Sequence, residues 1–215
     1  MRFWGGKSAA MAFSETGTDI LAPGGGCDYP AIVSYQNDFD GTNPISKEYY
    51  DRFYKAINFC NTAIYHVKNV PFSDKALTSK REAEVRFLRA YYYWILVETF
   101  GDTYYTDQPS ESIVMAPRKT SVSEIYTHIF EDLDFCMDSR LSVAQSDGGR
   151  VTMWAAKALK ARLLLTRASE LNDKALYEQA YTLAKEVIDN GPFELSKDFA
   201  QYLIWKILME MAIRK

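Results

Sequence analysis

Side chains with the chemistry of a sugar-binding loop gather between Cys27 and Phe39, in the stretch CDYPAIVSYQNDF. A sugar ring has apolar C–H faces and hydroxyl edges, so its pocket needs aromatic platforms beside carboxylate, amide and hydroxyl groups. Those groups are supplied by Asp28, Tyr29, Tyr35, Gln36 and Asn37. Many polar loops have a similar composition, so this chemistry alone does not separate a glycan site from an ordinary loop.

Two glycine-containing stretches resemble ion or phosphate sites but lack essential positions. GGKS, which ends at Ser8, needs a glycine five positions before Gly6 to form a phosphate-binding loop, and that position is Met1. QNDFDGTNP resembles a calcium loop, but Gln36 and Lys47 occupy its first and twelfth ligand positions. We therefore expect no nucleotide cofactor and no metal ion.

Catalytic patterns are also incomplete. His66 and His128, the two histidines, have no second histidine or cysteine at i+3 or i+4, which argues against zinc. Carboxylates such as Asp132 are predicted to lie on solvent-facing helical positions. A glycoside hydrolase, which stays open as an alternative, would need two carboxylates about 5–10 Å apart across a cleft. The sequence predicts no catalytic residue.

Composition excludes several classes of protein. The 215 residues are 47% hydrophobic and carry a net charge of −3 without a basic cluster, which is unlike a nucleic-acid binder. The longest apolar runs fall short of the ~18 residues that a membrane span needs. The N-terminus lacks the apolar core of a signal peptide. The protein is therefore expected to be cytoplasmic, or to have an exporting segment that this chain does not contain.

Hydrophobic spacing predicts helices and few strands. Residues 1–45 are rich in turn formers and are predicted to be mostly loop, whereas a helical stripe begins after Ser46. The predicted helices span 46–70, 79–100, 121–137, 153–168 and 173–190. Residues 196–215 are apolar and helix-prone, but their stripe is poorly defined.

Capping patterns set several of these boundaries. Ser79 with Glu82, and Ser121 with Glu124, match the capping box that opens a helix. Gly101 is a plausible C-terminal stop for the second helix. The fourth helix is predicted to begin after Thr152.

The helix EAEVRFLRAYYYWILVETFGD, from Glu82 to Asp102, is apolar or aromatic nearly all round. An exposed helix has one apolar stripe, so this one is predicted to be buried among other helices. Arg86 can pair with Glu82 one turn earlier. Arg89 is expected to reach a carboxylate or a helix-end carbonyl elsewhere, because a buried guanidinium needs its donors satisfied.

Residues 152–190 resemble a tetratricopeptide repeat, a helix–turn–helix unit of ~34 residues that stacks on its neighbours. The similarity consists of Ala161, the pair Ala180 and Ala184, and Pro192 just after the second helix. Together with the other helices it predicts an all-α fold, an alpha-alpha superhelix of stacked helical pairs.

Five segments, in order, are similar to the SusD/RagB family. The aromatic helix resembles the family pattern A-E-x-R-F-L-R-A-Y-x-Y followed by F-G-D, and four further segments match neighbouring family elements. They are YDRFYKAINFCNTAI, APRKTSVSEIYTHIFEDLD, GRVTMWAAKALKARLLL and YEQAYTLAKEVIDNGPFEL. The resemblance covers roughly residues 15–195.

This resemblance implies a lipid-anchored, surface-exposed lipoprotein of the outer membrane that binds oligosaccharides or other nutrients without catalysis. Its partner would be a SusC-like TonB-dependent transporter. It also implies one domain over residues 1–215, with a ligand-side segment at 1–45, a helical scaffold at 46–195 and an atypical end at 196–215. Family members are longer, so the chain is expected to be truncated at both ends, without the export signal and the lipid anchor.

In the family, ligand-contacting loops lie before the first of these helices, in a stretch matched here by Thr18 to Asn43. Carried over by position, the predicted ligand-binding residues are Asp28, Tyr29, Tyr35, Asn37 and Phe39. The alternative function is a helical-repeat module that binds the transporter or a peptide and has no glycan site of its own.

Overall fold

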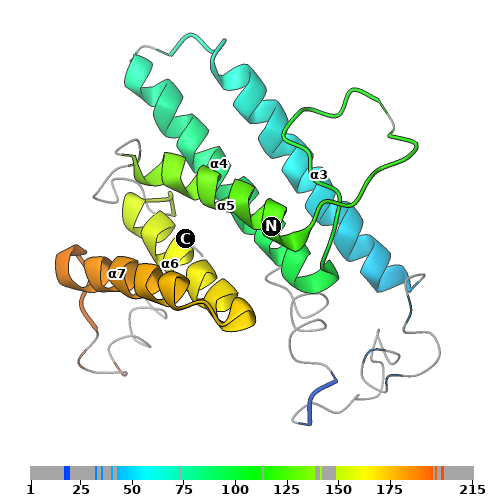
Figure 1. Ribbon diagram of the computed structural model, residues 1–215. Coiled ribbons are helices and arrows are strands. Elements are labelled where there is room, and N and C mark those ends of the chain that lie inside the picture. Colours follow the sequence, from blue (N-terminus) through cyan, green and yellow to red (C-terminus); the bar gives the residue numbers. More distant parts are fainter. Residues whose placement is uncertain are drawn as a thin grey trace. The chain divides into compact units, whose positions relative to one another are not determined.

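The computed structural model describes residues 17–19, 32, 35, 40, 43–72, 74–112, 114–138, 141, 149–195, 197 and 200. Five helices occupy these ranges: α3 (Pro44–Val67), α4 (Lys75–Phe100), α5 (Val122–Met137), α6 (Met153–Leu171) and α7 (Lys174–Asn190) (Figure 1). Within the described residues there is no strand, and an isolated antiparallel bridge joins Thr103 to Thr120. The prediction of an all-α fold is confirmed.

The chain divides into two compact units, residues 1–141 and 142–215. In the first unit α4 packs against both α3 and α5, and Figure 1 shows these three helices side by side. Helix α4 therefore has a neighbouring helix on each of two sides. Tyr93 and Leu96 of α4 are buried, as are Ile125 and Ile129 of α5. The burial predicted from the all-round apolar pattern of this helix is confirmed.

The predicted α3 stripe is confirmed. Asn43 caps this helix by accepting a hydrogen bond from the Ile45 amide, and Pro44 suits the first turn, where no N–H is needed. The residues at three- and four-residue steps that face the core are Tyr49, Phe53, Ile57, Cys60 and Val67. The helix begins two residues before the predicted Ser46.

The predicted start of α4 was wrong. Its cap is Asp74, whose carboxylate accepts from the Ala76 amide at 2.8 Å, so Ser79 lies inside the helix. Asp is as good an N-cap as Ser, and the earlier cap adds one turn to the helix. Gly101 ends α4 with a φ of 68°, as predicted. The Ser121 cap of α5 is also confirmed, because its hydroxyl accepts from the Glu124 amide.

The second unit contains the α6–α7 pair, and the two helices pack on each other. Thr152 and Asp173 cap them, and Asn172 makes the turn between them in the left-handed conformation. Buried Leu163 and Leu164 lie on α6, and Ala180 lies on α7. This pair matches the helix–turn–helix unit predicted from residues 152–190.

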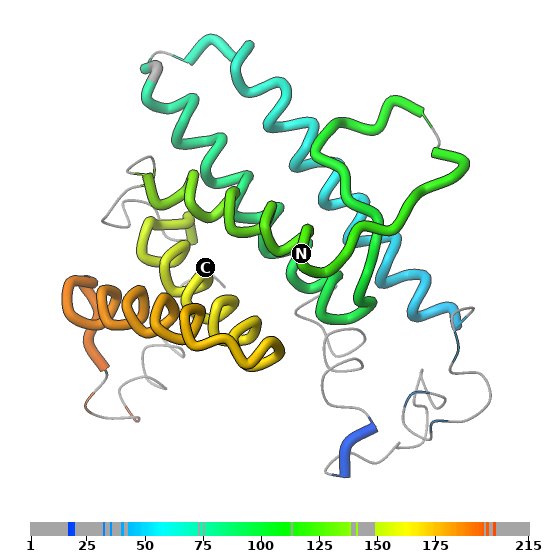
Figure 2. The backbone as a smooth tube through the Cα atoms, in the orientation of Figure 1, coloured from blue at the N-terminus to red at the C-terminus, as the bar shows by residue number. Residues whose placement is uncertain are grey.

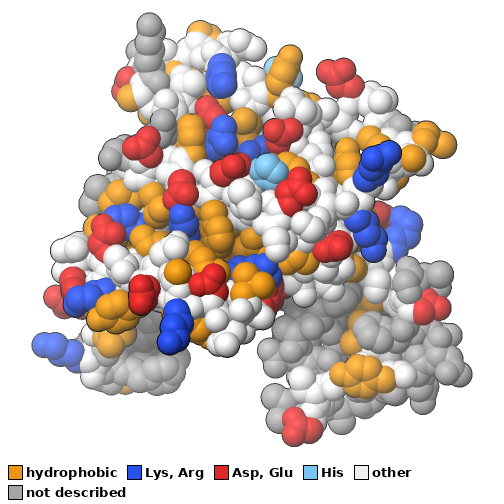
Figure 3. Space-filling model, viewed as in Figure 1, with side chains coloured by type: hydrophobic (Ala, Val, Ile, Leu, Met, Phe, Trp, Pro, Cys, Tyr) orange, Lys and Arg blue, Asp and Glu red, His pale blue; other side chains and the backbone are white. Residues whose placement is uncertain are grey.

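The described surface is polar and mixed in charge. Ion pairs one helical turn apart include Arg52 with Glu48 on α3, and Lys185 with Asp189 on α7 at 2.7 Å. Figure 3 shows basic and acidic side chains lying among one another on the face in view. Such pairs on exposed helix faces contribute only tenths of a kcal/mol each, about 0.3–0.5.

Candidate ligand-binding site

Of the five predicted ligand-binding residues, the structure describes Tyr35. Its side chain is 69% exposed, its φ is 51°, and its hydroxyl donates to the Gly17 carbonyl at 2.9 Å. Asp28, Tyr29, Asn37 and Phe39 lie outside the described residues. An exposed ring held by a hydrogen bond at its far end suits a stacking platform, and the grouping of these five residues stays a prediction.

A buried ion network ties α3, α4 and α5 together. The Arg89 guanidinium, 4% exposed, donates to Asp132 from Nε and Nη2 at 2.7 and 2.8 Å. Its Nη1 donates to the Asn61 amide oxygen of α3 at 3.0 Å. Arg86 bridges Glu82 and Asp132, each at 2.9 Å. The predicted Arg86–Glu82 pair and a carboxylate partner for Arg89 are both confirmed.

The predicted solvent-facing position of Asp132 was wrong, since this residue is 3% exposed. It lies three residues after buried Ile129, on the same stripe of α5 that faces α4. Two arginines compensate its charge there. Burial alone would lower the pKa of Arg89, but the hydrogen bonds and charge of Asp132 outweigh burial and raise that pKa. The Arg89 guanidinium therefore stays protonated, and the network acts as scaffold.

This scaffold also fixes the segment that leaves α4. The loop between α4 and α5, green in Figure 2, passes beside α3. The Tyr93 hydroxyl donates to the Thr106 carbonyl at 2.7 Å and accepts from the Thr106 amide at 2.9 Å. Asn61 donates to the carbonyls of Thr106 and Gln108, and Asn58 accepts from the Ser110 amide at 2.8 Å. Helical side chains therefore hold this loop in place.

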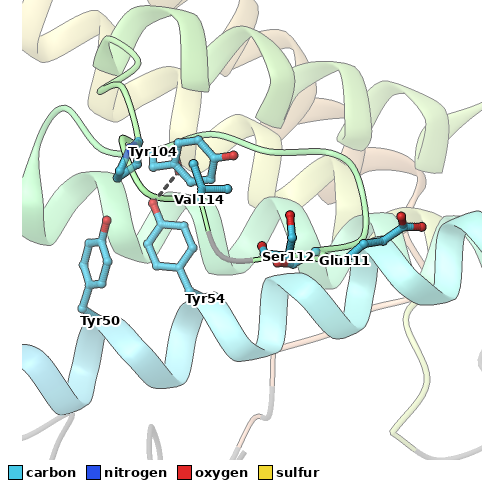
Figure 4. A pocket seen from close by; sticks show the side chains of 8 residues that line it. Tyr50, Tyr54, Tyr104, Glu111, Ser112 and Val114 are labelled. Carbon is cyan, nitrogen blue, oxygen red and sulfur yellow. Dashed lines mark hydrogen bonds between the residues drawn. The ribbon is translucent and has the colours of Figure 1, made fainter.

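Between α3 and this loop lies a concave site of about 500 Å³, here named the tyrosine hollow. Figure 4 draws its eight lining side chains and labels six of them, Tyr50, Tyr54, Tyr104, Glu111, Ser112 and Val114. The rings of Tyr50 and Tyr54 lie 4.5 Å apart, because residues four apart share one face of a helix. Tyr104 lies 6.4 Å from Tyr54, with the two rings within 27° of parallel.

Hydrogen bonds hold these rings in position. The Tyr54 hydroxyl donates to the Tyr104 carbonyl and lies 2.8 Å from the Thr103 hydroxyl. Thr103 in turn donates to the Tyr50 hydroxyl at 3.3 Å. Burial raises the pKa of Tyr54, so its hydroxyl stays neutral at physiological pH. The hollow is therefore formed before any ligand arrives, which lowers the entropy cost of binding.

The chemistry of the tyrosine hollow matches a hydroxylated ring. Aromatic faces accept apolar C–H surface, while the Glu111 carboxylate and the hydroxyls of Ser110 and Ser112 can bond to hydroxyl groups. Sequence reasoning did not select Tyr50, Tyr54 or Tyr104. Tyr50 and Tyr54 lie four residues apart on α3 and outside its buried stripe. This spacing could have indicated that they share an accessible face of the helix.

Among the described residues, no group of three or more His, Cys, Asp or Glu side chains is placed to hold a metal ion. No described helix has the length and apolar character to cross a membrane. Cys60 and Cys136 are both buried.

Comparison with known proteins gives matches over most of the chain. A SusD-like family model, described as starch-binding and associating with the outer membrane, matches residues 28–165. A SusD-like protein of Bacteroides ovatus is 25% identical over 207 residues, which are 93% of this chain and 37% of that protein. The starch-binding protein SusD of Bacteroides thetaiotaomicron is 29% identical over 126 residues, 59% of this chain and 22% of that protein. This chain thus spans little more than a third of the length of the Bacteroides ovatus protein.

Solved structures share the fold. A SusD superfamily protein of Parabacteroides distasonis has a TM-score of 0.71 at 28% identity, over 81% of this chain and 37% of that one. A structure described with a xylogluco-oligosaccharide has a TM-score of 0.68 at 27% identity, over 79% of this chain and 34% of that one. A laminarin-binding SusD-like protein has a TM-score of 0.66 at 25% identity, over 78% of this chain and 34% of that one.

Proposed function

Because this chain belongs to the SusD-like family of starch-binding proteins that associate with the outer membrane, we propose that it binds oligosaccharides at the cell surface without cleaving them. The tyrosine hollow is the observation that carries this proposal. It offers three neighbouring aromatic rings, hydroxyl groups and a single charged lining residue, Glu111. Similar proteins are described with a xylogluco-oligosaccharide and with laminarin, both neutral glucans.

The proposed binding surface has two parts. Tyr50, Tyr54 and Tyr104 stack against sugar faces, and Glu111 accepts hydrogen bonds from hydroxyl groups. The predicted loop residues Asp28, Tyr29, Tyr35, Asn37 and Phe39 supply further contacts to the same glycan. The bound glycan is delivered to a SusC-like TonB-dependent transporter, and the protein is held at the outer membrane by a lipid anchor. No cofactor takes part.

Calorimetric titration with maltoheptaose and with a xyloglucan oligosaccharide tests the proposal. Removing one stacking ring with Tyr104→Ala is expected to weaken binding about tenfold, because truncating a central aromatic residue of a binding surface often costs more than about 1 kcal/mol. Tyr29→Ala and Tyr35→Ala test the predicted loop in the same way. Tyr181→Ala is the matched control, because Tyr181 is an exposed tyrosine of the other unit.

Three results count against this function. Absence of binding across a broad glycan array would exclude a working site in this chain. Equal affinity of Tyr104→Ala and the unmodified protein would remove the tyrosine hollow from that site. Release of shortened sugars during the titration would instead favour a hydrolase.

The alternative function is binding of a protein segment by the helical repeat. An apolar groove of about 590 Å³ on α6 and α7 favours it, with Tyr181 and Ile188 exposed at 66% and 77%. In this alternative, an amphipathic helix of the transporter binds in the groove. Its binding would be abolished by Ile188→Lys and unaffected by Tyr104→Ala, which is the reverse of the glycan pattern.

A further inference from the structure

A second concave site of about 440 Å³ lies in the first unit and is here named the polar pocket. Its walls come from the end of α3, from α4, from the loop after α4, and from α5. The side chains that matter for its chemistry are Lys68, Tyr105, Asp107, Gln108, His128 and Glu131. A cavity of this size with convergent polar groups is typical of a small-molecule site.

The polar pocket is separate from the tyrosine hollow, although one loop borders both. Tyr104 lines the hollow and packs on Tyr54. The next residue, Tyr105, lines the polar pocket, stacks on His128 with centroids 4.1 Å apart and planes within 10°, and also packs on Tyr93. The two sites share no lining residue.

The inner wall of the polar pocket does not favour anions. Arg86 and Arg89 line it, but their guanidinium groups donate to Glu82, Asp132 and Asn61. The lining contains three basic residues, Lys68 and the two arginines. It also contains three acidic ones, Asp107, Glu131 and Asp132, so the formal charges cancel. Neither positive nor negative charge dominates the lining of the polar pocket.

The outer wall carries donors and acceptors together. The Glu131 carboxylate lies 2.9 Å from the His128 ring nitrogen Nδ1, and the Gln108 amide donates to Asp107 at 3.1 Å. Lys68 adds an ammonium group with three donors. A hydroxyl group donates one hydrogen bond and accepts others, so a ring bearing several hydroxyls can satisfy both kinds of wall group at once.

We propose that the polar pocket binds one neutral sugar residue by its hydroxyl groups, as a second contact point beyond the tyrosine hollow. Asp107 and Glu131 accept from the sugar hydroxyls, and Lys68 donates to them. The hollow, in contrast, holds sugar rings by their faces. Two linked sites raise the effective concentration of a glycan at the second once the first is occupied.

Titration of the His128 ring resonances by NMR tests this site directly, with D-glucose, D-galactose and D-xylose as neutral probes and D-glucuronate as the anionic probe. A saturable shift with at least one neutral probe is expected. Asp107→Asn keeps the size of that side chain and is expected to weaken the interaction about tenfold, the usual effect of removing a charged hydrogen-bond partner. Glu178→Gln, at an exposed position of α7 that lines neither site, is the control and should leave the shift unchanged.

Three outcomes would overturn the second site: no shift with any neutral probe, a shift that persists at full strength in Asp107→Asn, or D-glucuronate binding as tightly as the best neutral probe. These outcomes are independent of the proposed function, because oligosaccharide binding that is sensitive to Tyr104→Ala reports on the hollow. Lys68→Ala provides a second variant, since its exposed side chain can be removed without disturbing the core.

Discussion

The Arg89 guanidinium of α4 and the Asp132 carboxylate of α5 face each other in the core, joined by two hydrogen bonds of 2.7 and 2.8 Å. Asn61 of α3 accepts a third bond from the same guanidinium. A buried charge is costly unless it is paired and hydrogen-bonded, so this geometry makes each partner dependent on the other. Three helices are fixed in register by one ion network.

Asp132→Asn is expected to lower the free energy of unfolding by about 3–5 kcal/mol, because it leaves a buried guanidinium without its counter-charge. Urea titration followed by circular dichroism measures this loss. Asp134→Asn, on the exposed side of the same helix, is the control and should change stability by less than about 0.5 kcal/mol. Equal losses in the two variants would show that the pair is not the cause.

Asn58→Ala should loosen the loop beside the tyrosine hollow while leaving every lining residue intact. The change removes the acceptor for the Ser110 amide, at a cost of about 1 kcal/mol. Glycan affinity is expected to fall about fivefold, the factor that corresponds to one lost hydrogen bond. Faster hydrogen exchange at the Ser110 amide would accompany it. Asn69→Ala, at an exposed position after α3, should change neither the glycan affinity nor the hydrogen exchange at the Ser110 amide.

Gly101→Ala should destabilise the protein through its backbone alone. Gly101 has φ 68° and ψ −136°, and a Cβ added there would meet no atom within 4 Å. The expected loss is about 1–2 kcal/mol. Gly101→Asn should not recover it, because the left-handed region that Asn tolerates lies at ψ near +30 to +60°. Thermal unfolding of both variants measures this, and a stable Gly101→Asn would contradict the reasoning.

Stability should fall in alkaline solution. Burial raises the pKa of Tyr49 and of Tyr105 to about 12, from an ordinary 10.0, and that of the Cys60 thiol to about 12, from 9.0. Above pH 9–10 the unfolded chain therefore ionises these groups while the folded protein keeps them protonated. The unfolded state then binds fewer protons, so the free energy of unfolding decreases as pH rises toward about 12.

Urea titrations at several pH values across this window measure the slope, to which each such group contributes up to about 1.4 kcal/mol per pH unit. Tyr49→Phe removes one ionisable hydroxyl from the core and should make the decline shallower. A decline that is equally steep in Tyr49→Phe, or no decline at all, would contradict the assignment.

Local signals in the sequence were sufficient for most helices and several caps. Ser121 and Thr152 each precede a run of helical spacing, and each caps a helix as predicted. Asp173, the predicted first residue of the last helix, is its N-cap. The error at α4 arose because Ser79 with Glu82 satisfies the capping-box pattern, whereas the structure uses Asp74 and places Glu82 against Arg86. Two competing caps one turn apart cannot be ranked by spacing alone.

The candidate site depends on contacts between distant residues, which spacing does not report. The Tyr54 ring meets Tyr104 fifty residues later, after the chain has passed through α4. From the sequence alone, Asp132 cannot be distinguished from the surface carboxylates near it, because its partner Arg89 lies on another helix. Family resemblance directed attention to residues 18–43 instead, most of which lie outside the described residues, so that part of the site stays a prediction.

Since Tyr104 and Tyr105 contact neighbours on opposite sides of their loop, the number of residues between Gly101 and Thr106 is restricted. Consecutive side chains of an extended chain point in opposite directions. A one-residue insertion or deletion before Tyr104 would therefore turn each of the two rings to the opposite side of the loop. Length variation among homologues is therefore expected to accumulate after the Ser110 anchor and to avoid this short stretch. For protein engineers, the stretch that follows Ser110 is accordingly the safer place to graft new sequence.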